Sequence, residues 1–551
     1  MQHLRTSGLT VTSVSSNRTI VDATGPVSAV ETAFGVTIWD WHDTAQNRDF
    51  FGNDNQPVLP VSLASFVVGI SGLNNHYRAE HYALASPHAS AAGPIVGAYA
   101  PTDLKTAYDV VPLAARGYTG AGQALGLFEL DTFNPTNIST YDAQYGLVTV
   151  PPAPILVDGG SVPNGGEIEV ELDIEVMHAI APSAPITVWE GRNTDKGALD
   201  TYNAMVTSDT TRSNSTSWGQ CEPDTSAAIM TSLDNVFKQA AAQGQSFYAA
   251  SGDTGAFDCL GNPTSTFTGL AVDNPASDRY VTGVGGTTLE LGTNSSYFAE
   301  WAWSDRTRSP QLGSGGGLSI MFSEPAWQTG PGVANSFSNA MRQVPDVSLD
   351  ADPRTGYSVY ATDKGTTGWF VVAGTSAAAP VWAAFTGLLN QFGATSDLPG
   401  LGFANPTLYR LGSTAPLYPA FHDITTGDNL YYPATAGWDD ATGWGSFDAF
   451  NLARDLMGRR LPPGLVPGHP GVPDRTAPPP LPQSGPTNRS LVLAQTAQTT
   501  LTAQTAPPTQ TALPASTSPS PARLATPLAS LPSIQELIIR LMAVWLALLS
   551  I

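Results

Sequence analysis

The chain contains few residues of several kinds, and each shortage excludes a class of protein. Two cysteines among 551 residues are too few for a disulfide-rich scaffold or for a zinc site built from a cysteine and histidine cluster. Charged residues make up only 13% of the chain, and 24 Lys and Arg against 46 Asp and Glu give a formal net charge of −22. Because such a chain repels phosphate backbones, we expect no nucleic-acid partner.

Histidine is also scarce, which limits the choice of a catalytic base. Of the eight histidines, five precede residue 98 and His469 lies in a Pro-rich tail. The other two, His178 and His422, have no glycine neighbours of the kind that flank a catalytic base. A Ser-His-Asp triad is therefore poorly supported, and a carboxylate is the better candidate for any base.

The chain does contain a serine in a setting suited to acyl transfer. Ser376 follows Gly374 and Thr375 and precedes an Ala-rich run that ends at Pro380. Small residues let a helix N-terminus lie close to a strand, where backbone N–H groups favour negative charge. A nucleophile needs such a place because an oxyanion forms beside it. The alternative is an ordinary Ser/Ala-rich helix start.

A candidate for the base lies in the acidic, apolar segment that follows Gly166. Its pattern predicts a partly buried helix that ends near Pro182. Glu169 and Asp173 are four residues apart and share one face of that helix. Two buried carboxylates on one face can share a proton, which suits general acid/base catalysis in acid. The alternative is a solvated acidic face at a helix N-terminus, which the helix dipole would stabilise.

Together with four further motifs, these segments resemble the sedolisin family, the serine-carboxyl peptidases with a subtilisin-like fold, and in particular its kumamolisin-like members. The match runs from about residue 98 to residue 457, with a further resemblance upstream. The further motifs are Ser217-Trp218-Gly219, Ser251-Gly252-Asp253-Thr254-Gly255, residues 315–319 with 325–328, and Pro345-Asp346-Val347-Ser348. The resemblance implies a parallel α/β sheet flanked by helices.

The resemblance also implies a role for each matching active-site residue. Ser376 would be the nucleophile, and Glu169 the general base that takes the serine proton and returns it to the leaving amine. Asp173 would orient Glu169. Asp253 would hold a proton and donate a hydrogen bond to the oxyanion, beside the Ser376 N–H. Since a carboxylate base and a protonated Asp253 both require acid, we expect activity at about pH 3–5.

Two more residues match positions that extend the carboxylate network in some members of the family. Glu129 lies at the end of an apolar run, and Trp218 lies in the Ser-Trp-Gly motif. The alternatives are an acid at a strand end and a tryptophan of the core.

A calcium site is the next feature that the resemblance implies. The family binds one Ca²⁺ with carboxylates and main-chain carbonyls, the ligands that this cation prefers. Here the carboxylates would come from Asp423 and Asp439, and the carbonyls from Ile424, Thr435 and Gly437. Thr435 stands where the family has glycine. The alternative is two Asp/Gly turns without a metal.

The two cysteines each follow a motif that the resemblance brings to the active site. Cys221 comes just after Ser217-Trp218-Gly219, and Cys259 comes just after the Asp253 motif. A disulfide between them is consistent with an exported enzyme. The alternative is two free, buried thiols.

Composition divides the chain into five segments. Residues 1–84 resemble part of a family prodomain, in which 27–36 predicts a helix running into a strand. Residues 85–97 are an Ala/Ser/Pro-rich linker and the expected self-cleavage zone, and 98–457 are the peptidase domain. Residues 458–532 are rich in Pro, Thr and Ala and predict a disordered spacer. Residues 533–551 are apolar but interrupted by Glu536 and Arg540, which leaves an interfacial helix or a weak anchor as options.

The sequence therefore predicts an acid-acting endopeptidase that is made as a self-processing zymogen. Its partners would be protein or peptide substrates and its own prodomain, which acts as inhibitor and chaperone, and we expect a monomer. The location would be secreted or at the cell surface, although no signal peptide follows Met1. A tripeptidyl-peptidase of the same family is one alternative, and a catalytically silent surface binding protein is another.

Overall fold

An eight-stranded sheet lies at the centre of the computed structural model, which describes residues 1–457 except 45–46, 77, 87–89, 91–92, 396–397 and 415–417, together with 522–527 and 537–543. The strand order is β16-β15-β13-β11-β8-β10-β9, with β21 beside β15. All pairs are parallel except β15 with β16. The strands are β8 Leu125–Glu129, β9 Ala153–Leu156, β10 Ile186–Glu190, β11 Ser213–Thr216, β13 Ser246–Ala250, β15 Thr282–Leu291, β16 Tyr297–Ala302 and β21 Val347–Asp350.

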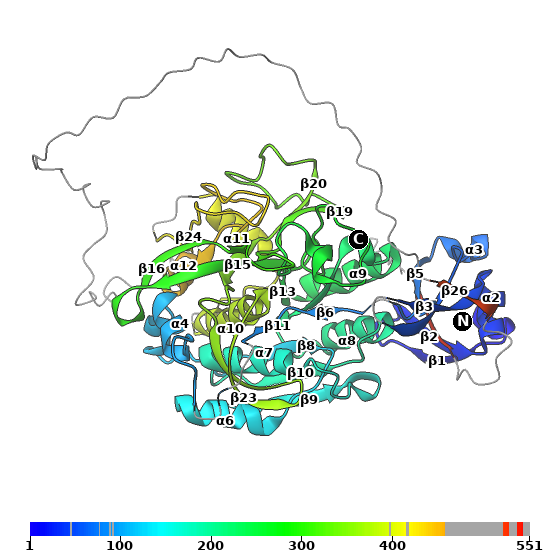
Figure 1. Ribbon diagram of the computed structural model, residues 1–551, viewed down its shortest axis with the longest axis horizontal. Coiled ribbons are helices and arrows are strands. Elements are labelled where there is room, and N and C mark those ends of the chain that lie inside the picture. The colour runs from blue at the N-terminus through cyan, green and yellow to red at the C-terminus, as the bar shows by residue number, and fades with distance from the viewer. Residues whose placement is uncertain are drawn as a thin grey trace, which may run out of the picture. The chain divides into compact units, whose positions relative to one another are not determined.

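Helices cover both faces of this sheet (Figure 1). Consecutive residues of a strand point to opposite faces: Leu127 packs into the core with helices α7 (Glu167–Ile180) and α10 (Thr375–Ala394). The next residue, Phe128, packs into a second core with α8 (Asp195–Ser208) and α9 (Ala227–Gln243). The predicted parallel α/β sheet flanked by helices is thus confirmed.

A hairpin leads directly into α10. Strands β22 (Tyr357–Asp363) and β23 (Thr366–Ala373) pair antiparallel along their whole length. The sequence predicts this hairpin from the apolar runs 355–360 and 369–372, and that prediction is confirmed. Its second strand ends two residues before α10 begins, which fixes where the N-terminus of α10 lies.

The residues before the linker have an apolar core of their own, which includes Leu4, Val30, Phe34 and Ile38. The predicted helix is present, and Gly35, with φ of 61°, ends it in the left-handed conformation that glycine tolerates. The elements are α1 Gln2–Thr6, β1 Thr10–Val14, β2 Ile20–Gly25, α2 Val27–Phe34, β3 Ile38–Asp43, β4 Arg48–Asn53, α3 Val61–Ala64 and β5 Val67–Ser71.

Two strands from the C-terminal part of the chain complete the sheets of this region. Strand β27 (Leu537–Ala543) lies between β2 and β5, and β26 (Ala522–Pro527) pairs with β3. The interfacial helix considered for the apolar segment is therefore wrong at Leu537–Ala543, because consecutive β-branched residues there favour a strand that has partners on both sides. Strand β26 at Ala522–Pro527 falls within the predicted spacer 458–532, and the rest of that spacer lies outside the described residues.

Shorter elements complete the described part of the chain. None of its helices has both the length and the apolar character needed to cross a membrane. The remaining helices and strands are β6 Glu80–His81, β7 Leu84–Ala85, α4 Pro101–Ala107, α5 Val111–Ala114, α6 Pro135–Tyr145, η1 Val157–Gly159, β12 Trp218–Cys221, η2 Glu222–Asp224, η3 Asp258–Gly261, β14 Asp273–Asn274, η4 Thr293–Ser295, β17 Ser304–Asp305, β18 Leu312–Gly313, β19 Gly317–Ser323, β20 Met341–Val344, α11 Asn405–Gly412, β24 Phe421–His422, β25 Ser446–Phe447 and α12 Ala449–Met457.

Candidate active site

Ser376 is the second residue of α10, at the point where β23 turns into this helix. Gly374 makes the turn with φ of 109°, a conformation that favours glycine. A Cβ at Gly374 would lie 1.9 Å from the Tyr82 carbonyl oxygen and 2.5 Å from Asp253 Oδ2, so no larger residue fits. The buried Ser376 hydroxyl donates a hydrogen bond to Glu169 Oε2 at 3.0 Å.

The carboxylates of α7 lie beside this serine because α7 packs against α10. Glu169 and Asp173 are both fully buried, so they are not part of a solvated acidic face. The Ser217 hydroxyl lies 2.9 and 2.8 Å from the two carboxyl oxygens of Asp173. These contacts hold the Asp173 side chain in place, one helical turn after Glu169 along α7.

Glu129 and Trp218 join the same buried network. Trp218 Nε1 donates to Glu129 Oε2 at 2.8 Å, and Asp173 is hydrogen-bonded to Glu129. Burial raises the pKa of Glu129 and that of Asp173 well above their usual range. Among the described residues, no Lys or Arg forms an ion pair with these carboxylates. A proton, held by Asp173 and accepted by Glu129, is therefore the neutralising group of this pair.

Asp253 reaches the serine from the loop after β13. Its Oδ1 accepts hydrogen bonds from the Thr375 N–H at 2.8 Å and from the Thr375 hydroxyl at 2.9 Å. Its Oδ2 is buried and has no hydrogen-bond partner among the described residues. Burial raises the pKa of Asp253 well above its usual range. A protonated Oδ2 beside Gly374 can therefore donate a hydrogen bond toward the serine.

A segment from upstream of the linker runs through this site. Its backbone pairs with the peptidase domain on both sides of Ala83. Before Ala83, strand β6 pairs antiparallel with β12, and after Ala83, β7 pairs antiparallel with β23. Between the two paired stretches, the Ala83 N–H donates to Glu169 Oε2 at 2.7 Å. The paired residues are Glu80 with Gly219, His81 with Trp218, Leu84 with Ala373 and Ala85 with Val372.

Two side chains of this segment contact the site, and the sequence analysis missed both. His81 Nδ1 lies 3.3 Å from Glu169 Oε2, and the buried Tyr82 hydroxyl donates to the Asp273 carboxylate. Ser217 was missed as well, although its Ser-Trp-Gly motif was a usable signal. No local pattern marks His81, Tyr82 or Asp273, because their contacts join segments far apart in the sequence.

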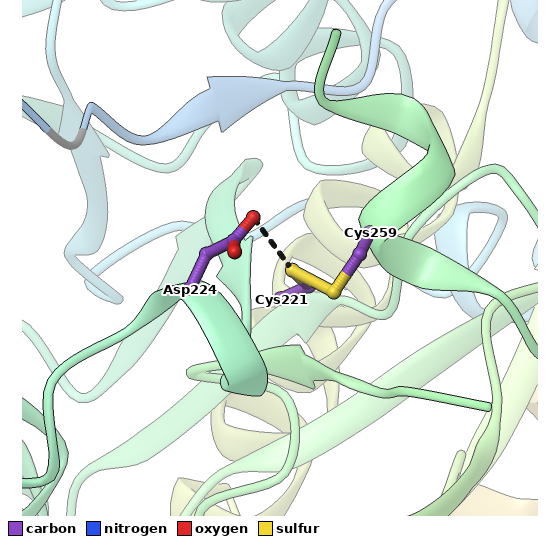
Figure 2. Close-up of side chains that lie close together, drawn as sticks. All are labelled: Cys221, Asp224 and Cys259. Atoms are coloured by element: carbon purple, nitrogen blue, oxygen red, sulfur yellow. Dashed lines mark hydrogen bonds between the residues drawn. A yellow bond between two sulfur atoms is a disulfide. The ribbon is translucent and has the colours of Figure 1, made fainter. Parts of the chain in front are cut away.

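Cys221 and Cys259 are joined by a disulfide in the described structure (Figure 2). Asp224 lies against it, with Oδ2 3.3 Å from Cys221 Sγ. These three side chains are close enough together to suggest a metal site. Disulfide sulfurs, however, carry no thiolate and cannot act as strong ligands. The bond joins β12 to the segment that follows Asp253, and both lie beside the site.

The residues expected to bind calcium lie in a separate loop. The Asp423 carboxylate accepts from the Gly437 N–H at 3.2 and 3.1 Å, and Asp439 Oδ2 accepts from the Thr435 N–H at 2.8 Å. Among the described residues, neither carboxylate forms an ion pair with a cationic side chain. Two carboxylates that meet one short loop without a cationic partner are a donor set that fits a hard cation.

Two family models match the chain. "Pro-kumamolisin, activation domain" matches residues 1–76, and "Subtilase family" matches residues 163–411. Residues 1–76 therefore correspond to an activation domain, and residues 163–411, which include Ser376, correspond to a subtilisin-like fold.

Individual relatives are similar over most of the chain. Kumamolisin of Bacillus sp. (strain MN-32) is 35% identical over 458 residues, which cover 79% of this chain and 78% of kumamolisin. Sedolisin of Pseudomonas sp. (strain 101) is 28% identical over 473 residues, covering 82% and 77%. The tripeptidyl-peptidase 1 of Dictyostelium discoideum is 28% identical over 351 residues, covering 60% and 53%.

Among solved structures, Pseudomonas sedolisin, a serine-carboxyl proteinase complexed with two molecules of pseudo-iodotyrostatin, superposes with a TM-score of 0.57 at 28% identity. The match covers 66% of this chain and 98% of that one. The chain is a serine-type peptidase with the prodomain of a zymogen, and it belongs to the sedolisin family.

Proposed function

We propose that this peptidase is an acid-acting endopeptidase in which Ser376 is the nucleophile and Glu169 the general base. The hydrogen bond from Ser376 Oγ to Glu169 Oε2, 3.0 Å long, supports this pairing. Glu169 takes the serine proton as Oγ attacks the substrate carbonyl, and returns it to the amine that leaves. Asp173, one turn along α7, orients Glu169 and extends the proton-sharing network to Glu129, which Trp218 holds in place.

Asp253 supplies the second donor for the oxyanion, next to the Ser376 N–H. The geometry supports this role because Thr375 occupies Oδ1, while Oδ2 has no hydrogen-bond partner in the part of the chain that the structure describes. A carboxyl can donate only while it holds a proton, and burial raises the pKa of Asp253 well above its usual range. Activity in acid follows, since deprotonation of Asp253 removes the donor and places a charge next to the oxyanion.

The path of the segment 79–85 carries the argument for endopeptidase action. A tripeptidyl-peptidase must close its cleft beyond the third residue before the scissile bond. Here the segment 79–85 passes through the site without a break and is paired with the peptidase domain both before and after Ala83. On its N-terminal side the chain continues past Glu80 to Ala79, whose N–H donates to Asn193 Oδ1 at 2.9 Å and whose carbonyl accepts from Asn193 Nδ2 at 2.8 Å. A cleft of about 730 Å³ lined by Asn193 and Trp218 accompanies this stretch.

We also propose one Ca²⁺ in the loop that follows β24. The Asp423 and Asp439 carboxylates and the carbonyls of Ile424, Thr435 and Gly437 would hold it, and the ion would cross-link the loop. Export to the outside of the cell fits the Cys221–Cys259 disulfide. The remaining proposed partners are protein or peptide substrates and the chain's own prodomain.

Digestion of a denatured protein at about pH 4 tests the function. We expect wild type and Ser139→Ala, which changes an exposed serine, to release internal peptides of many lengths. Ser376→Ala should release none. A tripeptidyl-peptidase would instead release successive tripeptides and would leave an N-acetylated substrate intact. If folded wild type cleaved nothing at any acid pH, the binding-protein alternative would replace the proposal.

A further inference from the structure

We infer that the first bond this peptidase cuts is its own Tyr82–Ala83 bond, and that the pocket holding Tyr82 selects substrates with a tyrosine before the scissile bond. The inference rests on the proposed roles of Ser376, Glu169 and Asp253. It concerns which bond and which side chain they act on.

Glu169 Oε2 contacts both groups between which a proton must move. It accepts from Ser376 Oγ at 3.0 Å and from the Ala83 N–H at 2.7 Å. A general base that activates a serine must later protonate the nitrogen of the amine that leaves. The nitrogen held at Glu169 is that of Ala83, so the bond to be broken is the one that joins it to Tyr82.

The carbonyl of the same bond lies where the oxyanion donors are. The Tyr82 carbonyl oxygen and Asp253 Oδ2 both lie against Gly374, within 1.9 and 2.5 Å of the position that a Cβ would take there. Asp253 Oδ2 has no other partner among the described residues. Both halves of one peptide bond, the C=O of Tyr82 and the N–H of Ala83, thus meet the groups that catalysis requires.

Backbone pairing holds this bond from both ends. Glu80 and His81 pair with β12 on one side, and Leu84 and Ala85 pair with β23 on the other. The Tyr82–Ala83 bond is the middle one of the three peptide bonds between β6 and β7, and its N–H group contacts the same Glu169 oxygen as Ser376 Oγ. A substrate held in this way is close to an attack geometry.

The reaction consumes one water molecule. Ser376 Oγ adds to the Tyr82 carbonyl carbon while its proton passes to Glu169. The Tyr82–Ala83 C–N bond then breaks, and Glu169 gives the proton to the Ala83 nitrogen. Water hydrolyses the ester that joins Tyr82 to Ser376, which frees the Tyr82 carboxyl group and restores the serine hydroxyl.

The Tyr82 side chain identifies a specificity pocket. It is 8% exposed, and its hydroxyl donates to the Asp273 carboxylate. Asp273 lies against Gly219, where a Cβ would be 2.2 Å from Asp273 Oδ1. A phenylalanine would fill the same space but remove the hydroxyl from which this buried carboxylate accepts, and a site built around a hydroxyl discriminates against the analogue that lacks it. The pocket therefore favours tyrosine over phenylalanine.

This bond lies just before the linker at 85–97, where the composition places self-cleavage. Ala/Ser/Pro-rich sequence marks a segment that proteases can reach, but it does not show which residues enter a cleft. The contacts of Tyr82 and Ala83 with Gly374, Asp253 and Glu169 show which residues lie in the cleft.

The first test maps the earliest cut. Full-length wild type is shifted to about pH 4, quenched at short times, and analysed by intact mass and N-terminal sequencing. We expect a new N-terminus at Ala83 and a fragment ending at Tyr82. Because the bond already lies in its own site, the first-order rate constant should not change over a roughly 100-fold range of concentration. An earliest N-terminus at or beyond residue 85, or a rate proportional to concentration, overturns the inference.

The second test measures how strongly the Tyr82 pocket prefers tyrosine to phenylalanine. We expect Tyr82→Phe to slow self-cleavage about 10-fold, while Tyr431→Phe, at an exposed position, leaves it unchanged. In a peptide with the sequence of residues 78–87, tyrosine at position 82 should give at least a ~10-fold higher kcat/KM than phenylalanine. Asp273→Leu should bring this ratio close to one. If that variant does not fold, the wild-type ratio alone decides, and a ratio near one contradicts the pocket assignment.

These results separate the inference from the proposed function. A wild-type enzyme that digests denatured protein but first cuts itself elsewhere contradicts only the inference. A folded wild-type enzyme that cuts neither itself nor a protein substrate contradicts the proposed function.

Discussion

The active site and the loop around Asp423 and Asp439 both hold carboxylates without a Lys or Arg side chain as partner among the described residues, but they differ in how these carboxylates are buried. In the active site, Glu129 and Asp173 are fully buried and hydrogen-bonded to each other. In the loop, Asp423 is exposed, and both carboxylates accept only from neighbouring N–H groups and a hydroxyl. Among the described residues, neither region gives its carboxylates a Lys or Arg partner.

A buried carboxylate without a cationic side chain needs another positive charge. In the active site a proton can supply the charge, because Glu129 and Asp173 are hydrogen-bonded to each other. In the loop, Asp439 is buried, and the proposed divalent cation can supply the charge. Under these two proposals, activity depends on acid and stability depends on a metal.

Loss of Glu169, the proposed general base, is expected to have the largest effect. Glu169→Gln keeps the size of the side chain but cannot take the proton of Ser376, so kcat for a peptide substrate should fall by about 10⁵-fold, as when a hydrolase loses its base. Glu290→Gln, an exposed glutamate, is the control. A loss under about 10-fold would mean that another group, such as His81, acts as the base.

Two substitutions of Asp253 test whether this residue acts as a hydrogen-bond donor to the oxyanion. Asp253→Ala should lower kcat by about 100- to 1000-fold through loss of one oxyanion donor. Asp253→Asn should keep Oδ1 for Thr375 and place an N–H₂ group where Oδ2 lies, so donation no longer requires acid. We expect this variant to remain active, with the alkaline limb of its pH profile shifted to higher pH. An Asn variant as inactive as the Ala variant at every pH would contradict the donor role.

The sequence predicts the parts of this site that depend on local spacing. Glu169 and Asp173 share a face because a helix repeats every 3.6 residues, and Ser376 lies at a helix start because of the small residues around it. The strands of the sheet follow from apolar runs. The insertion of β27 beside β2 and the contact of Tyr82 with Asp273 join segments that are far apart in the chain. No period or motif encodes them, so they required the structure.

Carboxylates outside the active site that are buried (Glu171) or partly buried (Asp195 and Asp448) are expected to make stability depend on pH. Burial raises the pKa of Glu171 and of Asp448 to about 7, and that of Asp195 to about 6. Their folded pKa values exceed the unfolded values near 4, so the stability they provide is complete below pH 4 and is lost as pH rises through 7. We expect Tm to fall by at least about 5 °C between pH 4 and pH 8.

Asp195→Asn sharpens this prediction, because burial is the cause of the raised pKa at this site. The amide cannot ionise, so the variant should regain part of the Tm lost at pH 8 and change little at pH 4. A Tm that is equal at both pH values, or higher at pH 8, would mean that these carboxylates have cationic partners in solution.

Removal of calcium is expected to have the smallest effect. It tests the proposal that a cation binds in the loop around Asp423 and Asp439. A bound ion at about 100 times its Kd stabilises the folded state by about 2.7 kcal/mol, so excess EDTA should lower Tm by about 3–6 °C. Asp423→Asn should start at the lower Tm and lose its response to EDTA. Asp428→Asn should keep that response, since Asp428 in the same region pairs with Arg306 at 2.6 Å at the surface and such pairs contribute little. An identical Tm with and without EDTA would leave Asp423 and Asp439 as turn-forming residues, and protons would then be the counter-charge in both regions.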